Sequence, residues 1–113
     1  MKIKKTEFDD VIIFKPNVYK DERGFFMESF NSIIQEELNE NFVQDNHSKS
    51  SKYVLRGLHY QWEKPMGKLV RVAKGRGLDI LVDIKEHSNT FGQWQSFELS
   101  EDNNNILWVL TTN

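Results

Sequence analysis

The sequence has no cysteine, only two prolines and no apolar run long enough to cross a membrane as a helix. Without cysteine no disulfide framework can form, so nothing in the chain points to the small secreted domains that depend on one. Lysines occupy positions 2, 4 and 5, but no apolar stretch follows them as it would in a signal peptide. We therefore expect a cytoplasmic protein.

The length of 113 residues predicts one small domain, spanning 1–113. Aromatic residues make up 12% of the chain and include eight Phe and three Trp, a content that argues against a disordered chain. Charged residues make up 28%, as expected for a chain with a water-facing surface.

The charges are distributed unevenly along the chain. Between Lys49 and Arg76 lie eight of the 15 basic residues and a single acid, Glu63, whereas sixteen of the 17 acids lie elsewhere. A basic middle in an acidic chain indicates a local anion site. A solvated basic hairpin is the alternative, and the acid-rich remainder disfavours nucleic-acid binding.

Short apolar runs alternate with turn residues along most of the sequence, which predicts an antiparallel barrel or sandwich. One small helix should begin at Ser32, where Ser32 to Gln35 has the form of a capping box and Ile34 and Leu38 share a face. The expected strands cover residues 11–14, 17–20, 25–30, 54–61, 68–73, 78–84, 94–99 and 106–110.

The expected strand Val54 to Gln61 carries two side chains suited to chemistry. Arg56 offers a planar fork of donors that fits phosphate, and His59 can take up a proton near neutral pH. Strict alternation would place them on opposite faces, so a bulge near Gly57 is needed to bring both to one ligand. The alternative is a purely structural strand with a surface arginine and a hydrogen-bonded core histidine.

Further residues complete a set suited to proton abstraction beside a carbonyl. His59 would act as the base, Lys68 would stabilise charge on a nearby oxygen, and Arg56 with Arg23 would hold a diphosphate. Asp83, on a neighbouring strand, is the best candidate for a carboxylate that orients the base, and it could equally be a surface residue of a hairpin. The predicted substrate is a phosphorylated or nucleotide-linked ketone.

A metal site is a weaker alternative. His59 and Glu63 supply one imidazole and one carboxylate, whereas His47 and His87 lie far away in turn-like segments. A metal would require two or three imidazoles close together. We therefore expect no metal and no other cofactor.

Four sequence blocks resemble the dTDP-4-dehydrorhamnose 3,5-epimerase family, in its order and at its spacing over nearly the whole chain. They are Asp21 to Phe30 (DERGFFMESF), Phe42 to Ser48 (FVQDNHS), Val54 to Gln61 (VLRGLHYQ) and Gly67 to Val72 (GKLVRV). The resemblance implies a cupin-type jelly-roll, a homodimer, and a metal-independent step in the synthesis of dTDP-L-rhamnose from a dTDP-4-keto-6-deoxy sugar.

The resemblance also implies roles for single residues. His59 matches the base that removes the protons at C3 and C5 of the sugar, and Lys68 matches a residue beside the sugar carbonyl. Some of the substrate-contacting positions, including Arg23, reach the site of a neighbouring subunit in the family. The matching substrate positions are Arg23, Glu28, Gln44, Asp45, Asn46 and Arg56.

After Ile106 to Val109 the family continues with a histidine-containing strand, a tyrosine that returns a proton and an aspartate that orients the base. No residue of this chain matches that tyrosine or that aspartate. We therefore expect a member that lacks the family's C-terminal strands and has impaired epimerase activity. The alternatives are a non-catalytic module that binds a nucleotide sugar, and a related sugar-nucleotide ketoisomerase.

Overall fold

The computed structural model describes residues 1–59 and 66–111, and this part of the chain consists of antiparallel strands with one short helix. The predicted all-β class is confirmed. The elements are β1 (Lys2–Lys5), β2 (Val11–Lys15), β3 (Val18–Asp21), β4 (Gly24–Met27), α1 (Ser32–Leu38), β5 (Met66–Val70), β6 (Arg76–Val82), β7 (Trp94–Ser100) and β8 (Ile106–Thr111).

The largest sheet has four strands in the order β1-β2-β8-β5, so the first and last parts of the described chain lie side by side. Its central strands are covered on both faces. In β2 four consecutive residues, Val11 to Phe14, are buried, and in β8 Ile106 to Trp108 are buried. An unbroken apolar run is the pattern of a strand with both faces covered, and it explains why alternation is absent here.

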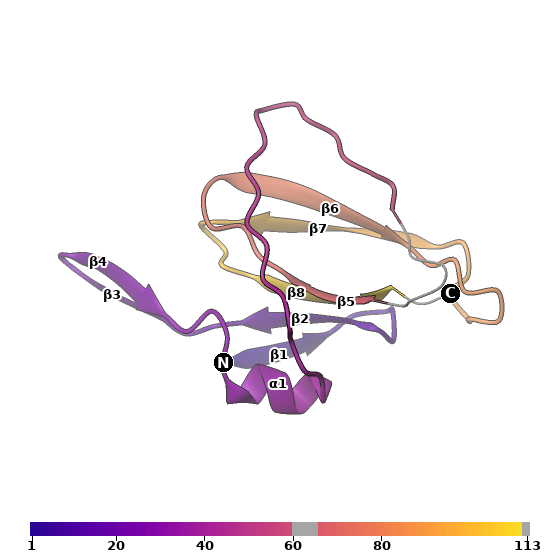
Figure 1. The fold of residues 1–113 in the computed structure, drawn as a ribbon, viewed down its shortest axis with the longest axis horizontal. Coiled ribbons are helices and arrows are strands. Elements are labelled where there is room, and N and C mark those ends of the chain that lie inside the picture. The colour runs from indigo at the N-terminus through magenta and orange to yellow at the C-terminus, as the bar shows by residue number, and fades with distance from the viewer. Residues whose placement is uncertain (60–65, 112–113) are drawn as a thin grey trace.

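One face of this sheet packs on α1. Ile34 of the helix is fully buried against Ile12, Phe14, Ile106 and Trp108. Figure 1 shows α1 lying beneath β1 and β2, on the side opposite the ribbon of β6 and β7. A seven-residue helix is too short to persist alone in water, so this packing is what stabilises it.

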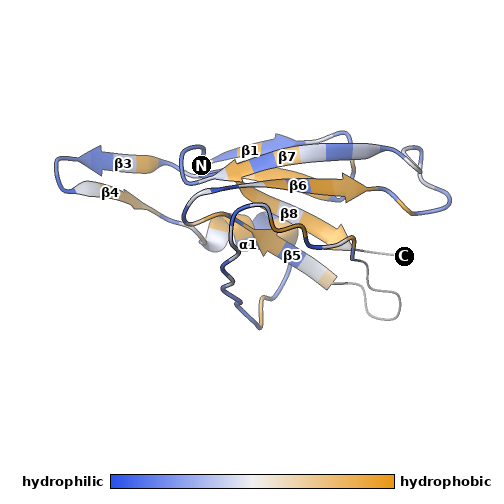
Figure 2. Cartoon of the chain, turned by 90° about the horizontal axis from the view of Figure 1, so that it is seen from above, coloured by the Kyte–Doolittle hydropathy of each residue, from blue (hydrophilic) through white to orange (hydrophobic). Residues whose placement is uncertain are grey.

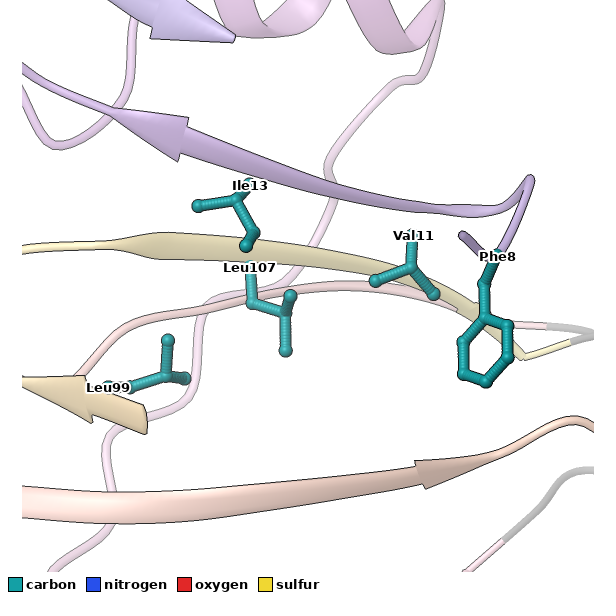
Figure 3. Close-up of a cluster of buried hydrophobic side chains, with 5 residues drawn as sticks. All are labelled: Phe8, Val11, Ile13, Leu99 and Leu107. Atoms are coloured by element: carbon teal, nitrogen blue, oxygen red, sulfur yellow. The ribbon is translucent and has the colours of Figure 1, made fainter. Parts of the chain in front are cut away.

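The other face of the sheet packs on the ribbon formed by β6 and β7. Phe8, Val11, Ile13 and Leu107 meet Leu99 of β7 in one buried cluster, and Figure 3 shows these side chains between the layers. The partly buried residues packed against the cluster are Val70, Val72, Leu81, Phe97 and Val109.

Strand β6 alternates as predicted, but its more apolar face points outward. Leu78, Ile80 and Val82 are 64%, 42% and 40% exposed, whereas Asp79 and Leu81 are partly buried and face the sheet. Figure 2 shows β6 as mainly hydrophobic along its length. The inward face of β6 therefore carries an acid, Asp79, beside Leu81.

Strands β3 and β4 form a separate hairpin that projects away from the rest of the molecule, as Figures 1 and 2 both show. The expected strands 17–20 and 25–30 are joined here by a tight turn, and Gly24 has φ 139°, a conformation that favours glycine. The hairpin leaves Tyr19, Phe25 and Phe26 more than 60% exposed.

Two local predictions differ from the structure. The helix does begin at Ser32, but its N-cap is Asn31, whose Oδ1 accepts a hydrogen bond from the Ile34 amide at 3.2 Å. Asn31 has the extended backbone of an N-cap residue and directly precedes Ser32. It therefore fills the capping position that the sequence pattern assigned to Ser32. Strand β1 was not predicted, because its residues are exposed and carry three lysines, as edge strands often do.

The prediction of a buried strand at Val54 to Gln61 is wrong for the described part of that segment. Residues 40–59 contain no helix or strand, and Leu55 and Leu58 are 92% and 79% exposed. A strand needs a neighbour to accept its ladder bonds, and no described strand lies in register with this segment. Tyr60 and Gln61, at the end of the expected strand, lie outside the described residues.

Candidate active site

Lys68 lies on β5, opposite Val109 of β8. Alternation puts it on the same face as Val70, which packs in the cluster between the sheet and the β6–β7 ribbon. Lys68 is itself exposed and lies on an edge strand of the main sheet, beside the space between the two layers. This is a suitable position for a cation that stabilises a bound oxyanion.

Across that space lies Asp79 of β6, which faces the sheet and is half-buried. Burial raises the pKa of the Asp79 carboxyl, and the positive charge of Lys68 opposes that rise. Sequence reasoning did not select Asp79, although one signal was available. In the strand from Leu78 to Ile84 an acid stands on each side of Leu81, on the less apolar face.

His59 and Arg56, the predicted base and phosphate ligand, lie in the segment 40–59 and are exposed. Figure 1 shows this segment leaving α1, passing the strands and arching beyond β6 before it returns toward β5. Gly57 lies between them at φ 119°, but without a ladder there is no bulge. Within the described residues no hydrogen bond joins His59 to Lys68, and His59 lies outside every strand.

The polar residues of the same segment are also exposed. Gln44 Nε2 donates to Asn46 Oδ1 at 3.1 Å, so these two are together, with Asp45 between them in sequence. Glu28 lies near the start of α1, where it accepts a hydrogen bond from Asn31 Nδ2 at 3.1 Å. Glu28 thereby helps to hold the residue that caps the helix.

Arg23 lies in the turn between β3 and β4, and Figure 1 shows this hairpin projecting away from β5. Its guanidinium contacts the Asp21 carboxylate at 2.7 Å, and its backbone amide donates to the same side chain at 2.8 Å. The side-chain hydrogen bond from Arg23 lowers the pKa of Asp21. The Arg23 side chain is 85% exposed, so it remains accessible to an anion.

Asp83 directly follows β6 and holds a turn. Its carboxylate accepts hydrogen bonds from the hydroxyls of Ser88 and Thr90 and from the Lys85 amide. Burial alone would raise the pKa of Asp83, but these hydrogen bonds lower it overall. In this structure the carboxylate is fully engaged within its own turn, and its predicted role toward His59 stays a prediction.

The described part of the chain holds no group of three or more His, Asp or Glu side chains arranged to bind a metal ion. Glu63, the carboxylate of the alternative metal site, lies outside the described residues. In the same part of the chain, no helix has the length and apolar character needed to traverse a bilayer.

Solved structures resemble this architecture closely. A crystal structure of dTDP-6-deoxy-D-glucose-3,5-epimerase from Legionella pneumophila, in complex with dTDP-4-keto-L-rhamnose, superposes with a TM-score of 0.90 at 47% identity. The match covers 97% of this chain and 60% of the Legionella chain. Together with the antiparallel sheets and the single short helix, this similarity defines the class as cupin-like β-sheet epimerases.

The chain belongs to the dTDP-4-dehydrorhamnose 3,5-epimerase family, whose sequence profile matches residues 5–112. It is 55% identical over 113 residues to the dTDP-4-dehydrorhamnose 3,5-epimerase of Shigella flexneri, covering 96% of this chain and 62% of that protein. The Salmonella typhimurium enzyme of the same name is 54% identical over 109 residues, covering 93% and 60%. The chain thus spans about three fifths of the length of these two relatives.

Proposed function

We propose that this chain binds a dTDP-linked 4-keto-6-deoxy sugar and removes the protons at C3 and C5, as a dTDP-4-dehydrorhamnose 3,5-epimerase. The observation that carries the proposal is the family match over residues 5–112, joined to the similarity with the Legionella structure solved with dTDP-4-keto-L-rhamnose. The four sequence blocks that resemble the family contain every residue to which the next paragraph assigns a role.

The reaction requires a base, an oxyanion partner and an anchor for the diphosphate. His59 would remove each proton from the carbon beside the ketone, because imidazole exchanges protons near neutral pH. Lys68 would stabilise the enolate oxygen that forms as the proton leaves. Arg56 and Arg23 would bind the diphosphate, and Glu28, Gln44, Asp45 and Asn46 would contact the rest of the substrate.

The proposal requires His59 to approach Lys68. Residues 40–59 form no ladder with a described strand, so no sheet hydrogen bonds oppose such an approach. The start of the segment is held by Phe42, whose ring packs on Phe30 and Trp108. Phe42 thus fixes one end of the segment on the far side of the main sheet, while His59 lies near its other end.

A homodimer is part of the proposal. The projecting β3–β4 hairpin, with three exposed aromatic side chains and Arg23 at its tip, suits a contact with a second copy. Sedimentation equilibrium of the 113-residue chain tests this. A mass of two chains supports the proposal, and a mass of one chain at micromolar concentration contradicts it. The cytoplasmic location stays a prediction.

The experiment that tests the activity is incubation with dTDP-4-keto-6-deoxyglucose in deuterated water, followed by NMR of the sugar. Incorporation of deuterium at C3 and C5 supports the proposal, and inversion at both carbons supports complete epimerisation. Saturable binding of the substrate without deuterium incorporation would instead support the nucleotide-sugar-binding module. Movement of the carbonyl to another carbon would support the ketoisomerase.

A further inference from the structure

Asp79 differs from the other carboxylates that take part in ionic contacts. Four of those form ion pairs on the surface or at its edge, namely Asp10, Asp21, Glu37 and Glu98. Asp79 instead faces the space between the layers, and within the described residues its carboxylate forms no hydrogen bond. A half-buried carboxylate without hydrogen bonds is costly unless a charge of opposite sign compensates it.

The side chains that surround Asp79 show which charge can compensate it. The β7 residues that face inward with it are Gln95, Phe97 and Leu99, and those of β2 and β8 include Val11, Ile13, Leu107 and Val109. None of these carries a charge. The face of the main sheet toward the ribbon also carries Lys15 of β2 and, opposite Ile13, Lys4 of β1. Lys68, which alternates with Val70 on β5, is the residue whose positive charge acts on the Asp79 carboxyl.

We propose that Asp79 is a positioning residue that holds the Lys68 ammonium over the space between the sheet and the β6–β7 ribbon. The proposal extends the proposed function, because Lys68 is the group assigned there to the enolate oxygen. Lys68 is exposed and lies on the edge strand β5, so water competes for its ammonium. The Asp79 carboxylate, fixed on β6 in the other layer, keeps the ammonium directed inward, where the enolate oxygen would form.

The pair makes a prediction that does not depend on activity. Burial raises the pKa of Asp79, and the charge of Lys68 counters that effect. Removing the charge with Lys68→Met should therefore raise the midpoint of the Asp79 titration further. Lys68→Arg keeps a positive charge and should leave the midpoint close to that of the unchanged chain.

The first test is a pH titration of the Asp79 carboxyl carbon, followed by NMR on labelled protein. Arg76→Met is the matched control, since Arg76 is a cation at the start of the same strand and pairs with Glu98 at 3.5 Å. An upward shift with Lys68→Met but not with Arg76→Met supports the pair. Equal shifts with both variants, or no shift with Lys68→Met, would overturn it. If Lys68→Met fails to fold, Lys68→Gln provides the same comparison.

The second test measures deuterium incorporation into the substrate. Asp79→Asn should slow exchange at C3 and C5 by about tenfold, less than direct loss of an acid or base. Asp79→Glu should recover part of that loss, and Glu98→Gln, which changes a carboxylate of the neighbouring β7, should leave the rate unchanged. Absence of exchange in the unchanged chain would contradict the proposed function, whereas the carboxyl titration would still decide whether Asp79 and Lys68 interact. Full activity of Asp79→Asn would overturn its role in positioning.

Discussion

The indole of Trp108 lies so close to Gly67 that a Cβ on residue 67 would sit 2.1 Å from Cη2 of the ring. Gly67 immediately precedes Lys68 on β5, and Trp108 is buried on the neighbouring strand β8. The missing side chain allows the indole to cover the strand at this point. The position of Lys68 therefore depends on a glycine beside it.

Gly67→Ala should destabilise the fold, since the ring that the new methyl group meets is buried and its neighbours would have to move. Overpacking of this kind costs about 1–3 kcal/mol. Gly77→Ala is the control, because there the nearest atom would be Cγ2 of Val72 at an ordinary 3.8 Å. Urea unfolding followed by tryptophan fluorescence measures both variants. Equal stability of the two would show that Trp108 accommodates the methyl group without cost.

Phe42 anchors the start of the segment that carries the proposed base, His59. Its ring meets Phe30 at 5.4 Å and Trp108 at 5.9 Å between centroids, both edge to face. Phe42→Ala should lower the free energy of unfolding by about 1–3 kcal/mol, from the lost ring contacts and burial. Val43→Ala, at a position 92% exposed, should change it by less than about 0.5 kcal/mol. Chemical denaturation distinguishes the two, and a large effect at Val43 would mean that its side chain is buried in solution.

Asp83 should make the free energy of unfolding depend on pH in the acidic range. Burial favours its neutral form, but hydrogen bonds from Ser88, Thr90 and Lys85 lower its pKa below the ordinary 3.8. A carboxyl whose pKa is lowered by folding contributes stability above its unfolded pKa, and that contribution is lost as the pH falls through the folded pKa. Asp83→Asn should thus be less stable than the unchanged chain at pH 6, with the difference shrinking below pH 3.8.

Thermal unfolding across this pH range measures the effect, and Asp102→Asn, at an exposed position in the turn before β8, controls for the change in net charge. A difference that stays constant with pH would mean that the hydrogen bonds do not favour the ionised form. If Asp83 also orients His59, as the sequence suggests, Asp83→Asn will slow substrate exchange in addition.

Much of the fold could be predicted because it follows from local patterns. The apolar run at Val11 to Phe14, the turn at Gly24 and the helix beginning at Ser32 each carry a signal within a few residues. The outward face of β6 could not be predicted from Leu78, Ile80 and Val82. Their hydropathy indicates a buried face, but the ribbon packs on the sheet through Leu81 and the inward face of β7.

The site was harder to predict because it combines residues that are distant in sequence. The role of Lys68 depends on which face of β5 points inward, and that follows from the pairing of β5 with β8. A role for Asp79 can be inferred only once the packing of β6 on the main sheet shows that its side chain faces the sheet. His59 presents the opposite case. The sequence block around His59 favours a strand. A strand forms only beside a second strand with which it can pair, and the pattern of one segment does not show whether such a neighbour is available.

The most direct measurement is the rate of deuterium incorporation at C3 and C5 of dTDP-4-keto-6-deoxyglucose in the unchanged chain, in His59→Asn and in His87→Asn. His87 is an exposed histidine in the turn after β6, so its variant controls for the general effect of losing an imidazole. The proposed function predicts that exchange falls by about 10²- to 10⁴-fold in His59→Asn and is unchanged in His87→Asn. Exchange at the full rate without the His59 imidazole would contradict it.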